Sequence, residues 1–254
     1  MGEEKLFSKS FLPHNKTTNH HGENIMLFDL LLTGNIKGAI ISFLLSVPII
    51  ILILSVHEYA HGIAAKKLGD PTAESLGRLT LNPLKHIDPI GFIMFLLIGI
   101  GYAKPVPINS RYFKKPKRDM AIVGVAGPLA NLLMALIFMF LIKLATLLTP
   151  FLPETAPAWV PTAISYLELI LYYGVFYNIA FMIFNLIPIP PLDGSRLLYA
   201  FLPMKALMWF QRYEQYFMWG LLGVFLVLSF RGISIITIFA DVIVDLLFKL
   251  FFIA

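Results

Sequence analysis

Long apolar runs constrain the fold of this chain more than any other feature of its sequence. The first run extends from Ala39 to Val56, and only three serines and one proline interrupt it: Ser42, Ser46, Pro48 and Ser55. Further apolar stretches cover residues 120–148, 165–187, 217–228 and 233–253. About 20 such residues let a helix cross a bilayer, where backbone polar groups must bond internally. We therefore expect an all-α polytopic membrane protein.

Composition supports a lipid environment and limits the chemistry. Hydrophobic residues make up 58% of the 254 residues and charged residues 14%, whereas soluble domains are about 25% charged. The net charge of +5 comes from clustered basic residues, which favours a topology signal over a nucleic-acid surface. With no cysteine in the chain, a zinc ion would have to be held by histidine and carboxylate.

An HExxH motif, His57 to His61, follows the first apolar run directly. Histidines four positions apart lie on one face of a helix and can bind one zinc ion. Glu58, between them, can then act as a general base for water. A chance match, or two histidines that cap the end of a helix, would explain the motif without a metal site. We expect one long helix from Asn35 to about Leu68, ended by Gly69-Asp70-Pro71.

The distribution of basic residues predicts which side of the membrane each loop faces. Ten Lys and Arg residues lie between positions 66 and 118, and the loop at 149–161 has none. The positive-inside rule therefore makes the first loop cytoplasmic and the second external. The span from Ser165 descends to the prolines at 188–191, which brings Asp193 to the depth of His57 and His61. Asp193 is thus the candidate third ligand, with Asp241 of the last span as its rival.

The chain divides into three expected regions. Residues 1–36 form a polar tail and an interfacial segment without the apolar core of a signal peptide. Residues 37–196 form the core, and residues 197–254 form C-terminal transmembrane helices. Within the core we expect a small strand at Ser75–Leu81 and a re-entrant element or half-buried hairpin at Ile90–Ile100. We see no stretch suited to a second soluble domain.

Three motifs on separate spans resemble those of the site-2 proteases, zinc metalloproteases that cleave substrates within the membrane. They are His57-Glu-Tyr-Ala-His61, Ala126-Gly-Pro-Leu-Ala-Asn131, and the segment 185–194, which reads NLIPIPPLDG. The resemblance covers about residues 37–196. It implies that His57, His61 and Asp193 bind zinc, that Glu58 is the catalytic base, and that the core has three spans. It also implies regulated intramembrane proteolysis of transmembrane substrates by a compact member without a PDZ or nucleotide-sensing domain.

Three further polar residues are candidates for contacting substrate or supporting the metal ligands: His86, Asn131 and Asn185. A hydrogen bond to substrate or a structural turn would each explain His86. We favour helix packing for Asn131, and contact with substrate or a ligand for Asn185, because it precedes the proline break. Ser75–Leu81 or Ala103–Ile108 could pair with an extended substrate by strand addition, or could be plain connections.

Two other classes of protein remain open at this point. A metal or ion transporter would use the same His, Glu and Asp residues, but it predicts paired broken helices near the midplane. A non-catalytic scaffold that binds membrane proteins would not need the complete set of His, Glu, His and Asp. We therefore expect a multi-pass cell-membrane protease whose active site opens to the cytoplasm.

Overall fold

Three long helices dominate the structure, a computed structural model that describes residues 36–98, 102–153, 155–157, 159–231 and 234–252. They are α3 (Ile36–Lys67), α6 (Pro116–Leu148) and α7 (Trp159–Leu186). Each is long and apolar enough to cross a membrane, over residues 43–67, 116–151 and 159–186. The expected all-α class is confirmed, and the core contains three helices of the length and apolar composition that membrane spans require. The expected N-terminal tail lies outside the described residues.

The remaining elements are shorter. Between the spans lie α4 (Thr72–Ser75), α5 (Pro89–Ile98) and the 3-10 turns η1 (Pro83–Lys85), η2 (Ser110–Tyr112) and η3 (Thr149–Phe151). After α7 come α8 (Asp193–Tyr199), α9 (Met204–Arg212), α10 (Glu214–Phe230) and α11 (Ile235–Phe252). The described residues contain no sheet, and their one isolated antiparallel bridge joins Ile87 to Ala103.

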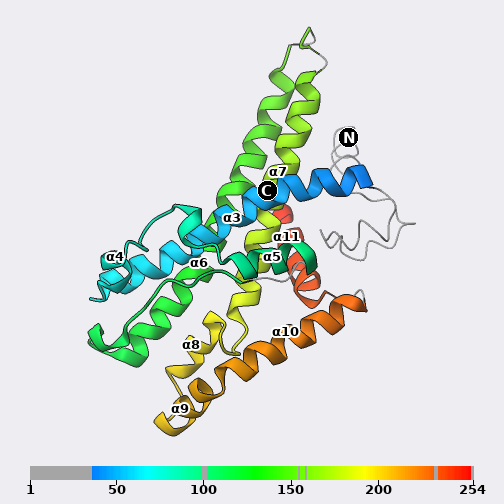
Figure 1. Ribbon diagram of the computed structural model, residues 1–254. Helices are drawn as coiled ribbons and strands as arrows, with labels where there is room; N and C mark the ends of the chain where they lie inside the picture. Colours follow the sequence, from blue (N-terminus) through cyan, green and yellow to red (C-terminus); the bar gives the residue numbers. More distant parts are fainter. Residues whose placement is uncertain (1–35, 99–101, 154, 158, 232–233, 253–254) are drawn as a thin grey trace.

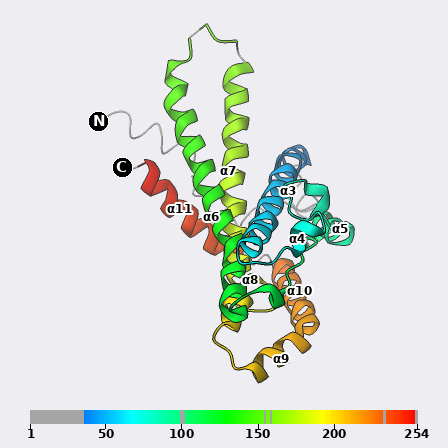
Figure 2. The ribbon, with the colours of Figure 1, turned by 90° about the vertical axis from the view of Figure 1, so that its left-hand side faces the viewer.

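Helices α6 and α7 form a long antiparallel hairpin, and α3 crosses it near the end that leads into α8 (Figures 1 and 2). Helix α11 packs beside the hairpin. A buried apolar cluster joins these three helices through Ala135, Met139, Ile142, Leu171, Val175, Ile179, Ala240 and Val244. The predicted final helix is thus integrated into the packing of the core.

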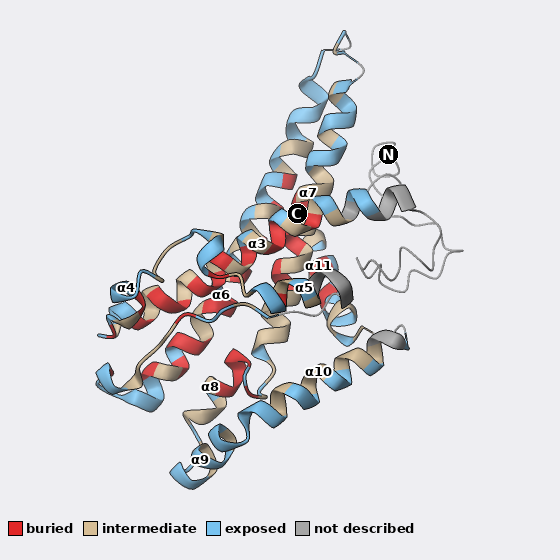
Figure 3. Cartoon of the chain, viewed as in Figure 1, coloured by how far each residue is buried: buried red, intermediate tan, exposed pale blue. Residues whose placement is uncertain are grey.

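Burial is concentrated where α3 crosses the hairpin and where α8 begins (Figure 3). Towards the turn between α6 and α7, large apolar side chains such as Phe140, Leu147 and Trp159 are exposed. Apolar side chains on the outside of a helix pair suit contact with lipid rather than water. Together with the apolar spans, this pattern defines an integral membrane protein.

The helix that carries the HExxH motif ends in a Schellman motif. Gly69 takes a positive φ of 108°, which a glycine adopts without steric cost. Its N–H donates to the Lys66 carbonyl at 3.0 Å, and the Asp70 N–H donates to the Ala65 carbonyl at 2.9 Å. These are the two bonds that satisfy the last carbonyls of a helix in this motif. The predicted end at Gly69 is confirmed.

The strand predicted at Ser75–Leu81 is wrong. Thr72–Ser75 is instead a short helix, and Gly77 follows it with φ +63°. The chain then folds back, so that the N–H groups of Arg78 and Leu79 both donate to the Ala73 carbonyl, at 2.8 and 3.2 Å. A left-handed residue in the middle of the segment prevents the extended backbone that the alternating pattern suggested.

Candidate active site

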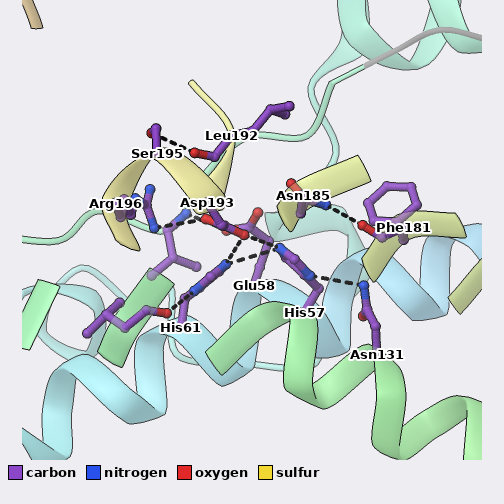
Figure 4. A network of polar contacts seen from close by, with 12 residues as sticks. His57, Glu58, His61, Asn131, Phe181, Asn185, Leu192, Asp193, Ser195 and Arg196 are labelled. Atoms are coloured by element: carbon purple, nitrogen blue, oxygen red, sulfur yellow. Dashed lines mark hydrogen bonds and ion pairs between the residues drawn. The ribbon is translucent and has the colours of Figure 1, made fainter. Parts of the chain in front are cut away.

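Two histidines and one aspartate from distant parts of the chain meet at a buried point. His57 and His61 come from α3, and Asp193 is the first residue of α8. The Asp193 Oδ2 atom lies 3.0 Å from His57 Nε2 and 2.9 Å from His61 Nε2, and the two nitrogens are 3.0 Å apart. These residues form the one group among the described residues that could hold a metal ion (Figure 4).

The ring orientation of His61 favours a metal at this point. Its Nδ1 lies 2.7 Å from the Val123 carbonyl oxygen of α6. A carbonyl only accepts, so Nδ1 carries the proton, and in the neutral ring Nε2 presents a lone pair. That lone pair faces a carboxylate oxygen and a second imidazole nitrogen. Three electron-rich atoms that converge in this way suit a cation between them.

Asn131 provides the corresponding support for His57. Its side-chain amide nitrogen lies 3.2 Å from His57 Nδ1, and its buried Oδ1 has no hydrogen-bond partner among the described residues. The two ends of an amide have nearly the same shape, so rotating the group by half a turn exchanges N and O. Oδ1 would then accept from the His57 Nδ1–H and leave Nε2 free for a metal. Asn131 thus contacts a candidate ligand as well as packing between helices.

Asp193 arrives at the site because the proline-rich segment 188–191 ends α7 and a new helix begins. A Cβ added at Gly194 would lie 2.3 Å from the Leu186 carbonyl oxygen, so only glycine permits this close passage of the backbone. Burial alone would raise the pKa of Asp193. The pKa of Asp193 nevertheless lies below its usual range, and the positive charge of the Arg196 guanidinium, 3.2 Å from Asp193 Oδ1, contributes to this. The side chain is therefore an anion at neutral pH.

Gly127 of α6 leaves the space in which the histidines lie. A Cβ at this position would be 2.4 Å from His61 Nε2 and 2.7 Å from His57 Nε2. No real Cβ makes contacts of that length. The sequence Ala126-Gly-Pro-Leu-Ala-Asn131 therefore supplies both a gap for the imidazoles and, one helical turn later, the Asn131 amide.

Glu58 lies between the two histidines along α3 and is also buried. Its Oε2 accepts a hydrogen bond from the Val106 main-chain N–H at 2.8 Å. It does not belong to the group formed by His57, His61 and Asp193. A carboxylate beside a metal site, but outside its ligand set, is in the position that a general base requires.

The other candidate residues are not members of this group of possible metal ligands. The His86 ring is buried, and its Nε2–H donates to the Thr80 carbonyl at 2.7 Å, which matches the turn-stabilising alternative. The Asn185 amide donates to the Phe181 carbonyl within α7 at 3.0 Å. Asp241 is exposed on α11 and is not part of the candidate metal group.

The donor set suits zinc. Two imidazole nitrogens and one carboxylate oxygen are typical catalytic zinc ligands, and three protein ligands leave one position open. Carboxylate-supported or carbonyl-supported imidazoles are equally typical of such sites. The fold and the site thus define a helical membrane metalloprotein with an HExxH helix and a distant aspartate.

Comparison with known proteins gives the family. The profile of peptidase family M50 matches residues 42–168 and 153–229. This chain belongs to peptidase family M50, the site-2 protease family, and its cofactor is zinc. No solved structure matches the chain.

Curated relatives carry names of the same kind. "Putative zinc metalloprotease YwhC" of Bacillus subtilis is 40% identical over 154 residues, which are 61% of this chain and 67% of that protein. "Putative zinc metalloprotease Rip2" of Mycolicibacterium smegmatis is 31% identical over 160 residues, 60% of this chain and 55% of that protein. "Putative zinc metalloprotease MJ0611" of Methanocaldococcus jannaschii is 26% identical, over 62% of this chain and 77% of that protein. The chain thus spans little more than half of the Rip2 protein.

Proposed function

We propose that this protein is an intramembrane zinc protease that hydrolyses peptide bonds in or near the transmembrane segments of other membrane proteins. The observation that carries the proposal is the buried convergence of His57, His61 and Asp193 beside Glu58. These residues lie on or next to helices apolar enough to cross a bilayer. A water-dependent site in such a setting fits cleavage of a substrate that is itself in the membrane.

The chain's own residues account for the proton transfers. His57, His61 and Asp193 would hold zinc, which activates water and polarises a carbonyl when it is bound. The Glu58 carboxylate accepts the proton of the attacking water and returns it to the leaving amine. His61 is fixed by the Val123 carbonyl and His57 by Asn131, so that both rings keep their orientation during the reaction.

The cytoplasmic side is the proposed side for substrate cleavage. The segments that carry these basic residues, from the end of α3 to the start of α6, lie towards the end of the hairpin that leads into α8, whereas η3 lies at its other end (Figure 1). That separation supports the orientation proposed from the positive-inside rule. In this proposed orientation the site opens to the cytoplasmic side of the cell membrane.

Replacement of Glu58 by glutamine tests this proposal. Glu58→Gln keeps the size of the side chain but removes the base, so we expect cleavage of a reconstituted single-span substrate to fall by at least about 100-fold. Zinc content should stay near one ion per chain. A transporter would keep metal flux in Glu58→Gln, and a scaffold would show no cleavage even as wild type. Turnover near the wild-type rate in Glu58→Gln would show that another group is the base.

A further inference from the structure

The segment Ala103–Asn109 lies against the HExxH helix at Val106 and contacts Glu58 through its main chain. Val106 is buried, and its N–H donates to Glu58 Oε2 at 2.8 Å. The neighbouring residues Pro105 and Pro107 have no N–H. Val106 therefore supplies the single main-chain donor of this Pro-Val-Pro sequence, and that donor is directed at the proposed base.

The segment is fixed on both sides of Val106. On one side, the Lys104 N–H donates to the His86 carbonyl at 2.8 Å. On the other, the Asn109 N–H donates to the buried Asp70 carboxylate at 2.7 Å. Each proline fixes its own φ and restricts the residue before it to extended conformations. The position of the Val106 N–H is thus determined by the covalent structure and by both anchors.

Arg78 adds a third anchor directly beside the prolines. Its Nη2 donates to the Lys104 carbonyl at 2.8 Å and to the Pro105 carbonyl at 3.1 Å. A single nitrogen of the planar guanidinium thus holds two consecutive main-chain carbonyls. Arg78 therefore connects the turn after α4 to the carbonyls that immediately precede Val106.

These bonds argue against strand addition at residues 104–107. A strand joins an edge through free N–H and C=O groups in alternation. Here Lys104 and Val106 already use their N–H groups, the two prolines have none, and the carbonyls of residues 104 and 105 accept from Arg78. This stretch is better suited to holding the protein's own Glu58 than to pairing with substrate.

We propose that Pro105-Val106-Pro107 is a positioning element that fixes the carboxylate of Glu58, and that Arg78 holds this element in place. The inference rests on the proposed role of Glu58 as base. Val106 and Arg78 are positioning residues, because they act through Glu58 and not on substrate. One carboxylate oxygen is held by Val106, which restricts rotation of the carboxylate. An error of about 1 Å in such placement can lower a rate by about 100-fold.

Hydrogen exchange of the Val106 amide tests the contact without any substrate. In protein labelled with 15N-valine, we expect Glu58→Ala to raise the exchange rate of the Val106 amide by at least about 10-fold, because its acceptor is lost. Glu58→Gln keeps an acceptor oxygen and should preserve the protection. Glu74→Ala, at an exposed carboxylate, is the matched control and should change nothing. Protection of Val106 that survives in Glu58→Ala would overturn the proposal.

Kinetics test what the contact does. The probe is a quenched-fluorescent peptide with one apolar span of about 20 residues, in detergent micelles. We expect Arg78→Ala to lower kcat by at least about 10-fold with KM within twofold and zinc content unchanged. Arg78→Lys should recover part of kcat, because the lysine ammonium keeps the positive charge and can still donate to these carbonyls. Lys85→Ala removes an exposed cation from the same loop and should behave as wild type.

Any other outcome would contradict either the positioning role or the proteolytic function. A raised KM with unchanged kcat in Arg78→Ala would identify the segment as a substrate contact and overturn the proposal. Unchanged kinetics, or loss of zinc, would overturn it as well. If the wild-type protein cleaves no transmembrane peptide while Val106 exchange still depends on Glu58, the proteolytic function fails and the contact between Val106 and Glu58 stands.

Discussion

The replacement Gly127→Ala adds one carbon atom at the point where the metal site tolerates it least. The new Cβ would lie 2.4 Å from His61 Nε2, and ordinary contact begins at 3.4 Å. The imidazole or the α6 backbone must therefore move by about 1 Å, several times the tolerance of about 0.2 Å in metal–ligand distances. His57 Nε2, at 2.7 Å, is displaced in the same direction. We expect zinc affinity to fall by at least about 100-fold.

The measurement is zinc content by mass spectrometry after dialysis against a graded series of chelator concentrations. Gly220→Ala in α10 is the matched control, because a Cβ there meets no atom within 4 Å. Both changes raise helix propensity by about 1 kcal/mol, so helix loss cannot explain a difference between them. Circular dichroism should show equal helix content. A Gly127→Ala protein that retains zinc as tightly as wild type would refute the steric argument.

Three further predictions concern the ligands and the orientation. Asp193→Ala should lose zinc and activity while Asp241→Ala keeps both, as measured by metal content and cleavage; the reverse would move the site to α11. Asn131→Ala should weaken zinc binding by about 10- to 100-fold in a chelator competition, whereas Asn131→Asp, which can still accept from His57, should retain most of it. Since the chain has no cysteine, one introduced at Ser110 should react with a membrane-impermeant thiol reagent only from the cytoplasm, and one at Thr155 only from outside. Labelling from the opposite sides would invert the proposed topology.

Local sequence signals were sufficient to predict the long helices. The long helix predicted at 35–68 is found at Ile36–Lys67. The apolar run and the Gly-Asp-Pro sequence that ends it are local signals, so no contact with a distant segment was needed to predict it. The convergence of Asp193 with the histidines also followed from span counting, since the direction of each span fixes the end at which its residues lie. The strand at Ser75–Leu81 failed because the conformation of one glycine decided the path of the chain.

The contacts that position Glu58 and the histidines could not be predicted in the same way. Val106 contacts Glu58 through an N–H that every residue except proline possesses, so no side-chain pattern marks it. The two flanking prolines are the available signal, because they leave a single donor between them. Similarly, Gly127 matters through the atom that it lacks, and its importance depends on how closely α6 approaches α3. Both features arise from packing between elements that are distant in sequence.

The exposed outer part of the α6–α7 hairpin separates contact with the bilayer from the packing that holds the active site. The α6 groups that contact the site, Val123 and Asn131, are found on the part of that helix that lies next to α3 and α8. The distal halves of the two helices carry exposed apolar side chains, up to η3 at the end of α6. A thicker or thinner bilayer can thus be accommodated by tilt or by a change in length at the distal halves. The same site architecture is thereby compatible with membranes of different lipid composition.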